Sequence, residues 1–184
     1  AAITWPRADN VLRLIQQRLA RLSPLALKLA RCAALAGPDL SSPLMSQVLG
    51  LRPLDMADAW SELEAAQVLR DGGFAHDLIA EAARALVPKA IARALHAQIA
   101  GFLERSDGEP MRIADHWLAA GEPRKAVPHL TSAARRAHAA WQRTQAADLY
   151  ERAATILRDA GDRRGAFDAF FAAAEAASQA AGKA

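Results

Sequence analysis

Histidines are the residues of this chain best suited to metal binding or acid–base chemistry. Three of the five, His76, His96 and His116, recur at intervals of 20 residues, but each falls in a different predicted element and no cysteine lies near them. His129 and His138 do not share a helical face. No HExxH pair places two metal ligands on one side of a helix. We therefore predict core or capping roles for all five histidines and no metal site.

The other groups that could carry a reaction are equally isolated. Cys32, the only cysteine, lies in the apolar run LARCAALAG and is predicted to be a small core residue. No serine occupies a GxSxG turn. The neighbouring carboxylates of Glu62 and Glu64 point to different sides of a helix. The sequence thus predicts no catalytic residue, and we expect a protein that is not an enzyme.

Composition excludes further classes of protein. Hydrophobic residues make up 52% of the 184 residues, which rules out a disordered chain, and no apolar run reaches the roughly 18 residues of a membrane span. The net charge of +3 permits an acidic partner without requiring one. No GxxxxGK[ST] phosphate loop is present, so we expect no cofactor in this segment. The N-terminal AAITWPRADN lacks the pattern of a secretory signal, and we predict a cytoplasmic location.

Prolines, glycines and serines divide a chain that is otherwise rich in helix-forming alanine and arginine. Ser23 before Pro24 and Ser42 before Pro43 each predict a helix start, so that helices are expected over 24–36, 43–49 and 55–66. The following QVLRDGGFAHD predicts a two-stranded ribbon around a polar turn that contains Asp71, Gly72 and Gly73. Further helices are expected over 77–87 and 88–105. This order predicts a winged-helix-like domain with connecting helices over residues 1–105.

A 40-residue repeat marks the rest of the chain. GEPRKAVPHL begins at Gly121 and GDRRGAFDAF at Gly161, and the match continues along one helical face. With a linker at 106–110, we expect helices over 112–120, 124–139, 142–158 and 164–180, forming two antiparallel hairpins over 106–184. They look like tetratricopeptide-type repeats, although an unrelated helical bundle stays open. Pro128 would break a helix begun at Pro123, so we expect a late start or a bend.

Several segments, in order, carry a family resemblance: RLARLSPLALKLARCAALAG, then FAHDLIAEAARALVPKAIARALHAQIAGFLE, then RIADHWLAAGEPRKAVPHLTSAARRA. Together they resemble the region downstream of the nucleotide-binding core in STAND-type signal-transduction ATPases, which include large LuxR-type transcriptional activators and ATPase-linked nucleotidyl cyclases of bacteria. In that family the region is a winged helix followed by a helical-repeat arm. The chain departs from the pattern where Ala80 precedes Glu81, and KAIARALH is less basic than usual.

The resemblance implies a non-catalytic regulatory and protein-interaction module of a larger bacterial ATPase, most simply a transcriptional regulator, although a cyclase parent stays open. ATP would bind only to an upstream domain. The implied partners are that nucleotide-binding domain, against which the winged helix packs, and a protein or small effector on the repeat arm. The 106–110 segment would serve as a hinge that lets the angle between the two parts vary. A free-standing helical-repeat scaffold is the alternative.

Direct DNA binding by the winged helix is a second alternative, and the sequence argues against it. The would-be recognition helix, SSPLMSQVLG, contains no lysine or arginine. Ser46 and Gln47 are its only side chains suited to base edges, while Leu44, Met45, Val48 and Leu49 resemble packing residues. The chain therefore has no evident DNA-reading surface here.

A candidate interaction surface lies on the repeat arm. It combines five basic residues with one aromatic residue: Arg124, Lys125, Arg135, Arg136, Arg143 and Trp141. Such a cluster could attract an anionic partner, although the same charges could also form an ordinary solvated helical face. Most other aromatic residues, namely Trp117, Tyr150, Phe170 and Phe171, are expected between helices. Trp141 and Phe167 are the candidates for an exposed rim.

Overall fold

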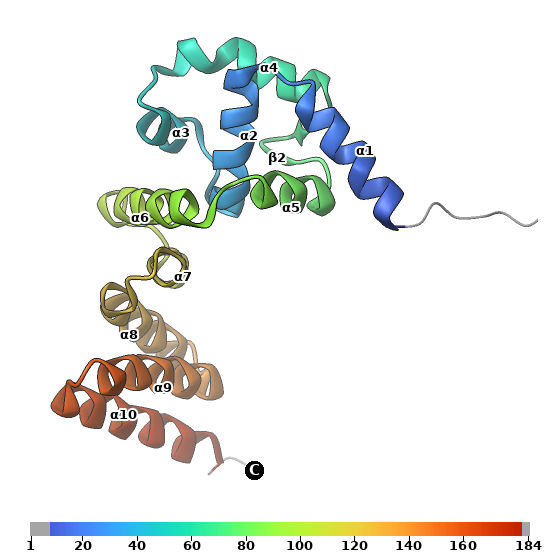
Figure 1. The fold of residues 1–184 in the computed structure, drawn as a ribbon. Helices are drawn as coiled ribbons and strands as arrows, with labels where there is room; N and C mark the ends of the chain where they lie inside the picture. Colours follow the sequence, from blue (N-terminus) through green and yellow to red (C-terminus); the bar gives the residue numbers. More distant parts are fainter. Residues whose placement is uncertain (1–7, 182–184) are drawn as a thin grey trace, which may run out of the picture. The chain divides into compact units, whose positions relative to one another are not determined.

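Helices dominate the computed structural model, which describes residues 8–181 (Figure 1). In this part of the chain one two-stranded ribbon is the only sheet. The predicted mainly α fold is therefore confirmed. None of the helices in the described part is long and apolar enough to cross a lipid bilayer. Residues 1–7, which hold most of the stretch used to predict localisation, lie outside the described residues.

The chain forms two compact units. The N-terminal unit ends at Leu95 and the C-terminal unit begins at His96, so the division falls inside helix α6 (Lys89–Arg105) and not at the 106–110 linker. The N-terminal unit contains α1 (Ala8–Ala20), α2 (Pro24–Ala36), the 3-10 turn η1 (Gly37–Asp39), α3 (Ser42–Leu49), the 3-10 turn η2 (Pro53–Met56), α4 (Ala57–Ala65), β1 (Leu69–Arg70), β2 (Gly73–Phe74) and α5 (Asp77–Ala85).

Helix α2 is the centre of the N-terminal unit because it packs against α3, α4 and α5. Its residues from Leu29 to Ala36 are buried except Arg31, and Leu44 and Leu63 from the surrounding helices are fully buried as well. The side chain of Arg84 on α5 reaches the end of α2, where its Nε and Nη2 donate to the Ala34 carbonyl at 3.1 and 2.9 Å. Three helices followed by a ribbon are thus assembled in the predicted order.

Serine caps begin α2 and α3, but the second cap lies one residue earlier than predicted. Ser23 Oγ accepts from the Ala26 N–H at 3.3 Å, and Pro24 is the first residue of α2. In α3 the cap is Ser41, whose Oγ accepts from the Leu44 N–H at 3.4 Å, whereas Ser42 is already helical. Ser41 has the extended backbone that an N-cap requires (φ −153°, ψ 152°). The pattern Ser-Ser-Pro does not distinguish the two serines, because proline is tolerated throughout the first turn.

The predicted ribbon is present, with Leu69 opposite Phe74 and Arg70 opposite Gly73. Its turn consists of Asp71 and Gly72, both at positive φ (51° and 78°). Two successive residues at positive φ are typical of a type I′ turn, and Asp-Gly is a sequence pair that favours it. The two-residue turn explains why Gly73, predicted in the turn, lies in a strand instead.

The Glu62 carboxylate joins α4 to the start of α2. Its Oε1 accepts from the Ser23 backbone N–H at 2.7 Å, a donor that the first turn of the helix leaves unused. Hydrogen bonding from Ser23, through its side chain and its backbone, lowers the pKa of the Glu62 carboxyl below its ordinary value. The ionised form of Glu62 is therefore the form that stabilises this junction.

Replacing Glu62 with glutamine is expected to lower the melting temperature at pH 7 and to matter much less at pH 3. The pKa of the Glu62 carboxyl is lower in the folded state than in the unfolded state. Its contribution to folding stability is therefore complete above the unfolded-state pKa of about 4.3, and it is lost as the pH falls through the lower folded-state pKa. Thermal unfolding of wild type and Glu62→Gln at both pH values tests this. Glu81→Gln, at an exposed position of α5, is the matched control. An equal difference in melting temperature between wild type and Glu62→Gln at both pH values would contradict the expectation.

The C-terminal unit continues from α6 into α7 (Pro110–Ala120), α8 (Pro123–Ala139), α9 (Arg143–Asp159) and α10 (Arg163–Ala181), and each of the last four packs against the next. The sequence repeat corresponds to two helical hairpins, α7–α8 and α9–α10. Gly121 and Gly161 occupy the same position in each, at φ 81° and 82°, a conformation that glycine adopts without strain. Ala126 and its repeat equivalent Ala166 are both buried.

The expected late start of the helix containing Pro128 is wrong. Helix α8 begins at Pro123 and includes Pro128 in its interior. Pro123 occupies the first helical position, where its missing N–H costs nothing, but Pro128 removes one hydrogen bond from the second turn. The packing of α8 against both α7 and α9 outweighs this loss.

The predicted 106–110 linker forms a hydrogen-bonded turn. The Gly108 N–H donates to the Leu103 carbonyl at 2.7 Å, and the Glu109 carboxylate caps α7 by accepting from the N–H groups of Met111 and Arg112, both at 3.0 Å. A Cβ at Gly108 would lie 3.0 Å from the Leu103 carbonyl oxygen, so the turn favours glycine. Hinge motion here stays a prediction, and it would have to break the Gly108 hydrogen bond.

Candidate functional site

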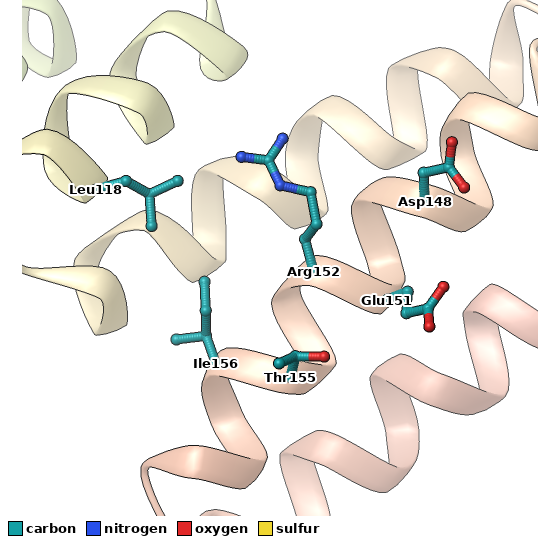
Figure 2. Close-up of a pocket in the computed structure, with 6 residues that line it drawn as sticks. All are labelled: Leu118, Asp148, Glu151, Arg152, Thr155 and Ile156. Carbon is teal, nitrogen blue, oxygen red and sulfur yellow. The ribbon is translucent and has the colours of Figure 1, made fainter.

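An open groove lies between α7 and α9 in the C-terminal unit and encloses about 480 Å³ (Figure 2). One lining residue, Leu118, comes from the last turn of α7. The others come from α9 and are spaced as neighbours on one helical face: Asp148, Glu151, Arg152, Thr155 and Ile156. Because α7 and α9 both pack against α8, that helix supports the groove from behind.

The groove combines an apolar end with charged walls. Figure 2 shows Ile156 and Arg152 on the side of α9 toward Leu118, whereas Glu151 and Thr155 point away from Leu118. Arg152 Nη2 lies 3.8 Å from Asp115 Oδ1 on α7, and both side chains are about half exposed. An ion pair this exposed contributes little stability and leaves both groups able to contact a ligand. The groove can therefore take a side chain at its apolar end and charged groups along α9.

A second hollow of about 380 Å³ adjoins the first and shares Ile156 with it. It lies where the α7–α8 turn meets the end of α9, and is lined also by Glu122, Pro123, Arg124, Asp159 and Ala160. Arg124 spans it, since its Nη2 donates to the Ala160 carbonyl at 3.4 Å. One residue of the candidate interaction surface is thus adjacent to the groove.

The six residues of that candidate surface fall into two groups. Arg124 and Lys125 are in the first turn of α8, and Arg135 and Arg136 lie toward its end, roughly 15 Å further along the helix axis. Trp141 and Arg143 follow at the α8–α9 turn and the start of α9. The six residues therefore do not form a single compact anion-binding patch.

Both groups have local partners. Lys125 Nζ lies 3.7 Å from Glu122 Oε2 and 4.6 Å from the ring centre of Trp117. The Arg143 guanidinium lies 4.6 Å from the ring centre of Trp141, which is 67% exposed. The first is a cation–π contact within the α7–α8 hairpin and the second lies at the turn between the two hairpins, and together they account for part of the basic cluster.

The aromatic side chains divide largely as predicted. Trp117 is buried, Tyr150 and Phe170 are partly buried, and Phe167 is exposed like Trp141. Phe171 is the exception, because it was expected between helices and is 65% exposed. It lies four residues after Phe167 on α10, and the two rings therefore share one face of the helix.

The structure brings together two histidines that the spacing argument kept apart. His96 on α6 and His116 on α7 face each other with 2.8 Å between their Nδ1 atoms, and His116 is 7% exposed. His96 shares a helical face with the buried Ile99, Ala100 and Leu103, a pattern that indicates a position near the core but does not identify His116 as its partner. Among the described residues no three potential ligands gather to hold a metal ion.

His76, His129 and Cys32 have structural roles. His76 caps α5, since its Nδ1 accepts from the Leu78 N–H at 3.3 Å, as predicted for a capping residue. His129 Nε2 and Trp117 Nε1 both contact Glu104 Oε1, at 2.8 and 2.7 Å. Cys32 is buried in α2, and burial raises the pKa of its thiol, which opposes formation of a nucleophilic thiolate.

Helix α3, the would-be DNA-reading helix, has the packing that the sequence predicted. Leu44 and Met45 are buried, and Val48 and Leu49 are partly buried. The Ser46 hydroxyl donates to the Leu51 carbonyl and so closes the end of its own helix.

Comparison with protein-family models, with curated proteins and with solved structures found no match for this chain.

Proposed function

We propose that this chain is a non-catalytic regulatory and protein-interaction module of a larger bacterial signal-transduction ATPase, acting in the cytoplasm and controlling transcription. The observation that carries the proposal is the groove between α7 and α9, which is open, partly apolar and lined by charged side chains. The order of elements in the N-terminal unit agrees with the family resemblance. In this proposal ATP binds to a domain encoded upstream.

The groove suits a protein segment that pairs an apolar side chain with basic ones. Leu118 and Ile156 offer an apolar surface, and the two lining carboxylates, those of Asp148 and Glu151, outnumber the single guanidinium of Arg152. That guanidinium also lies 3.8 Å from the carboxylate of Asp115. A helix or extended segment carrying a large apolar residue beside lysine or arginine would complement both features. This acidic groove, and not the basic cluster of Arg124 to Arg143, is therefore the proposed effector site.

The N-terminal unit is proposed to pack against the nucleotide-binding domain. Helix α3 contributes buried leucine and methionine to its own core and carries no lysine or arginine. Protein binding on this unit is thus better supported than DNA binding.

Selection of peptides from a random library tests the groove. Peptides enriched on the wild-type chain are expected to combine an apolar residue with lysine or arginine. Ile156→Glu should weaken their binding at least tenfold, about 1.4 kcal/mol, because it places a charge at the apolar end. Ala139→Glu, an exposed position of α8, is the matched control. Peptides that bind both variants equally would contradict the groove as the site.

The parent protein can be tested separately. The coding sequence upstream of this segment is expected to encode a phosphate loop, and a DNA-binding domain is expected elsewhere in the same frame. A frame without a phosphate loop would favour the free-standing scaffold and would end the ATPase proposal, while leaving the peptide experiment unaffected.

A further inference from the structure

The contact between His96 and His116 places a titratable pair at the junction of α6 and α7. The Nδ1 atoms are 2.8 Å apart, the ring centres are 5.0 Å apart, and the ring planes are inclined at 43°. His96 is half-buried and His116 is buried. At this Nδ1 separation one nitrogen must donate a hydrogen bond and the other must accept it.

The number of protons on the two rings decides whether this contact can exist. Two neutral imidazoles satisfy it when one carries its hydrogen on Nδ1 and the other on Nε2. One imidazolium beside one imidazole also satisfies it. Two imidazolium ions do not, because both then carry a hydrogen on Nδ1 and two donors face each other across 2.8 Å. The folded contact therefore accepts one extra proton and rejects the second.

Charged groups on α6, α7 and α8 influence how readily the His96–His116 pair binds protons, but they do not remove the limit set by the Nδ1–Nδ1 contact. On α6 they are Arg93 and Glu104, and on α7 Arg112 and Asp115, while α8 contributes the imidazole of His129. Glu104 is engaged by Trp117 and His129, and Asp115 pairs with Arg152. The guanidinium groups oppose a second proton on the pair and the carboxylates favour it. The Nδ1–Nδ1 contact is decisive because the two competing hydrogens would occupy the same short gap.

We propose that His96 and His116 form a pH-sensitive latch that holds α6 to α7 near neutral pH and opens when both rings are protonated. The latch is independent of the proposed function. The unfolded chain can protonate both histidines, whereas the closed latch can protonate one. The unfolded state thus binds more protons at low pH, and the latch loses stability as the pH falls from about 7 to about 5, around the ordinary histidine value of about 6.5.

Imidazole nitrogen NMR of the whole chain tests the latch without any substitution. The resonances of His96 and His116 are expected to titrate as a coupled pair in two separate steps, with one proton entering well before the other. Two independent single steps near the ordinary histidine value would overturn the proposal.

Urea unfolding between pH 7.5 and 5 provides a second measurement. When the unfolded state binds one proton more than the folded state, the equilibrium constant of unfolding rises tenfold for each pH unit that the pH falls. The unfolding constant of wild type should therefore rise more per pH unit than that of His96→Gln, by a factor of up to ten. Both proteins keep His129 and its contact with Glu104, so that contact is common to the comparison. His138→Gln is the control and should retain the wild-type slope. Equal slopes in wild type and His96→Gln would overturn the latch.

Discussion

Replacing Leu130 with alanine is expected to lower the free energy of unfolding of the C-terminal unit by about 2–5 kcal/mol. Leu130 is 0% exposed and lies on α8, which packs against α7 on one side and α9 on the other. Truncation removes buried apolar surface and leaves a cavity that two helix interfaces would have to collapse together to fill. The large end of the range applies where such collapse is restricted.

Denaturant unfolding of wild type and Leu130→Ala, followed by circular dichroism, measures this loss. Leu54→Ala is the matched control, because it makes the same chemical change at a side chain that is 83% exposed. The control should change the unfolding free energy by no more than about 0.5 kcal/mol. Similar losses in both variants would show that the burial of Leu130 does not contribute to the stability of this unit.

Enlarging Ala134 to leucine is expected to destabilise the same unit by about 1–3 kcal/mol through overpacking. Ala134 is 0% exposed on α8, so the added carbon atoms have no space unless neighbouring helices move apart. Leucine has nearly the helix propensity of alanine, so the loss would reflect packing and not the helix itself.

The matched control for this substitution is Ala139→Leu, which makes the same change at an exposed position of α8. Thermal unfolding should show a lower melting temperature for Ala134→Leu than for wild type. The melting temperature of Ala139→Leu should be almost unchanged. A stable Ala134→Leu variant would mean that the helices around α8 are loosely packed.

Local signals in the sequence predicted the elements well. Ser23 with Pro24 gave a correct helix start, and Asp71 with Gly72 predicted the turn of the ribbon, because each effect depends on the conformation of a few consecutive residues. The repeat of Gly121 and Gly161 predicted two hairpins for the same reason. Ser41 and Ser42 show the limit of such signals, since both can cap a helix and tertiary packing selects one.

Features that depend on contacts between helices were predicted poorly. Pro128 is tolerated in α8 because packing on two sides compensates for one missing hydrogen bond. His96 and His116 meet although no local pattern links them. The groove was also missed, because it joins Leu118 to residues of α9 far along the chain. The spacing of Asp148, Arg152 and Ile156 on one helical face was its only visible trace.

If the groove is the effector site as proposed, the position of α8 behind it gives residues that never touch a ligand control over which ligands fit. Small side chains on α8, including Ala126, Ala133 and Ala134, are buried where it packs against its neighbours. Their size limits how closely α7 and α9 can approach, and so the width of the opening between Leu118 and Ile156. Exchanging one small residue for another at these buried positions of α8 would change the width of the groove, and so the ligands that fit it, while every lining side chain stayed the same.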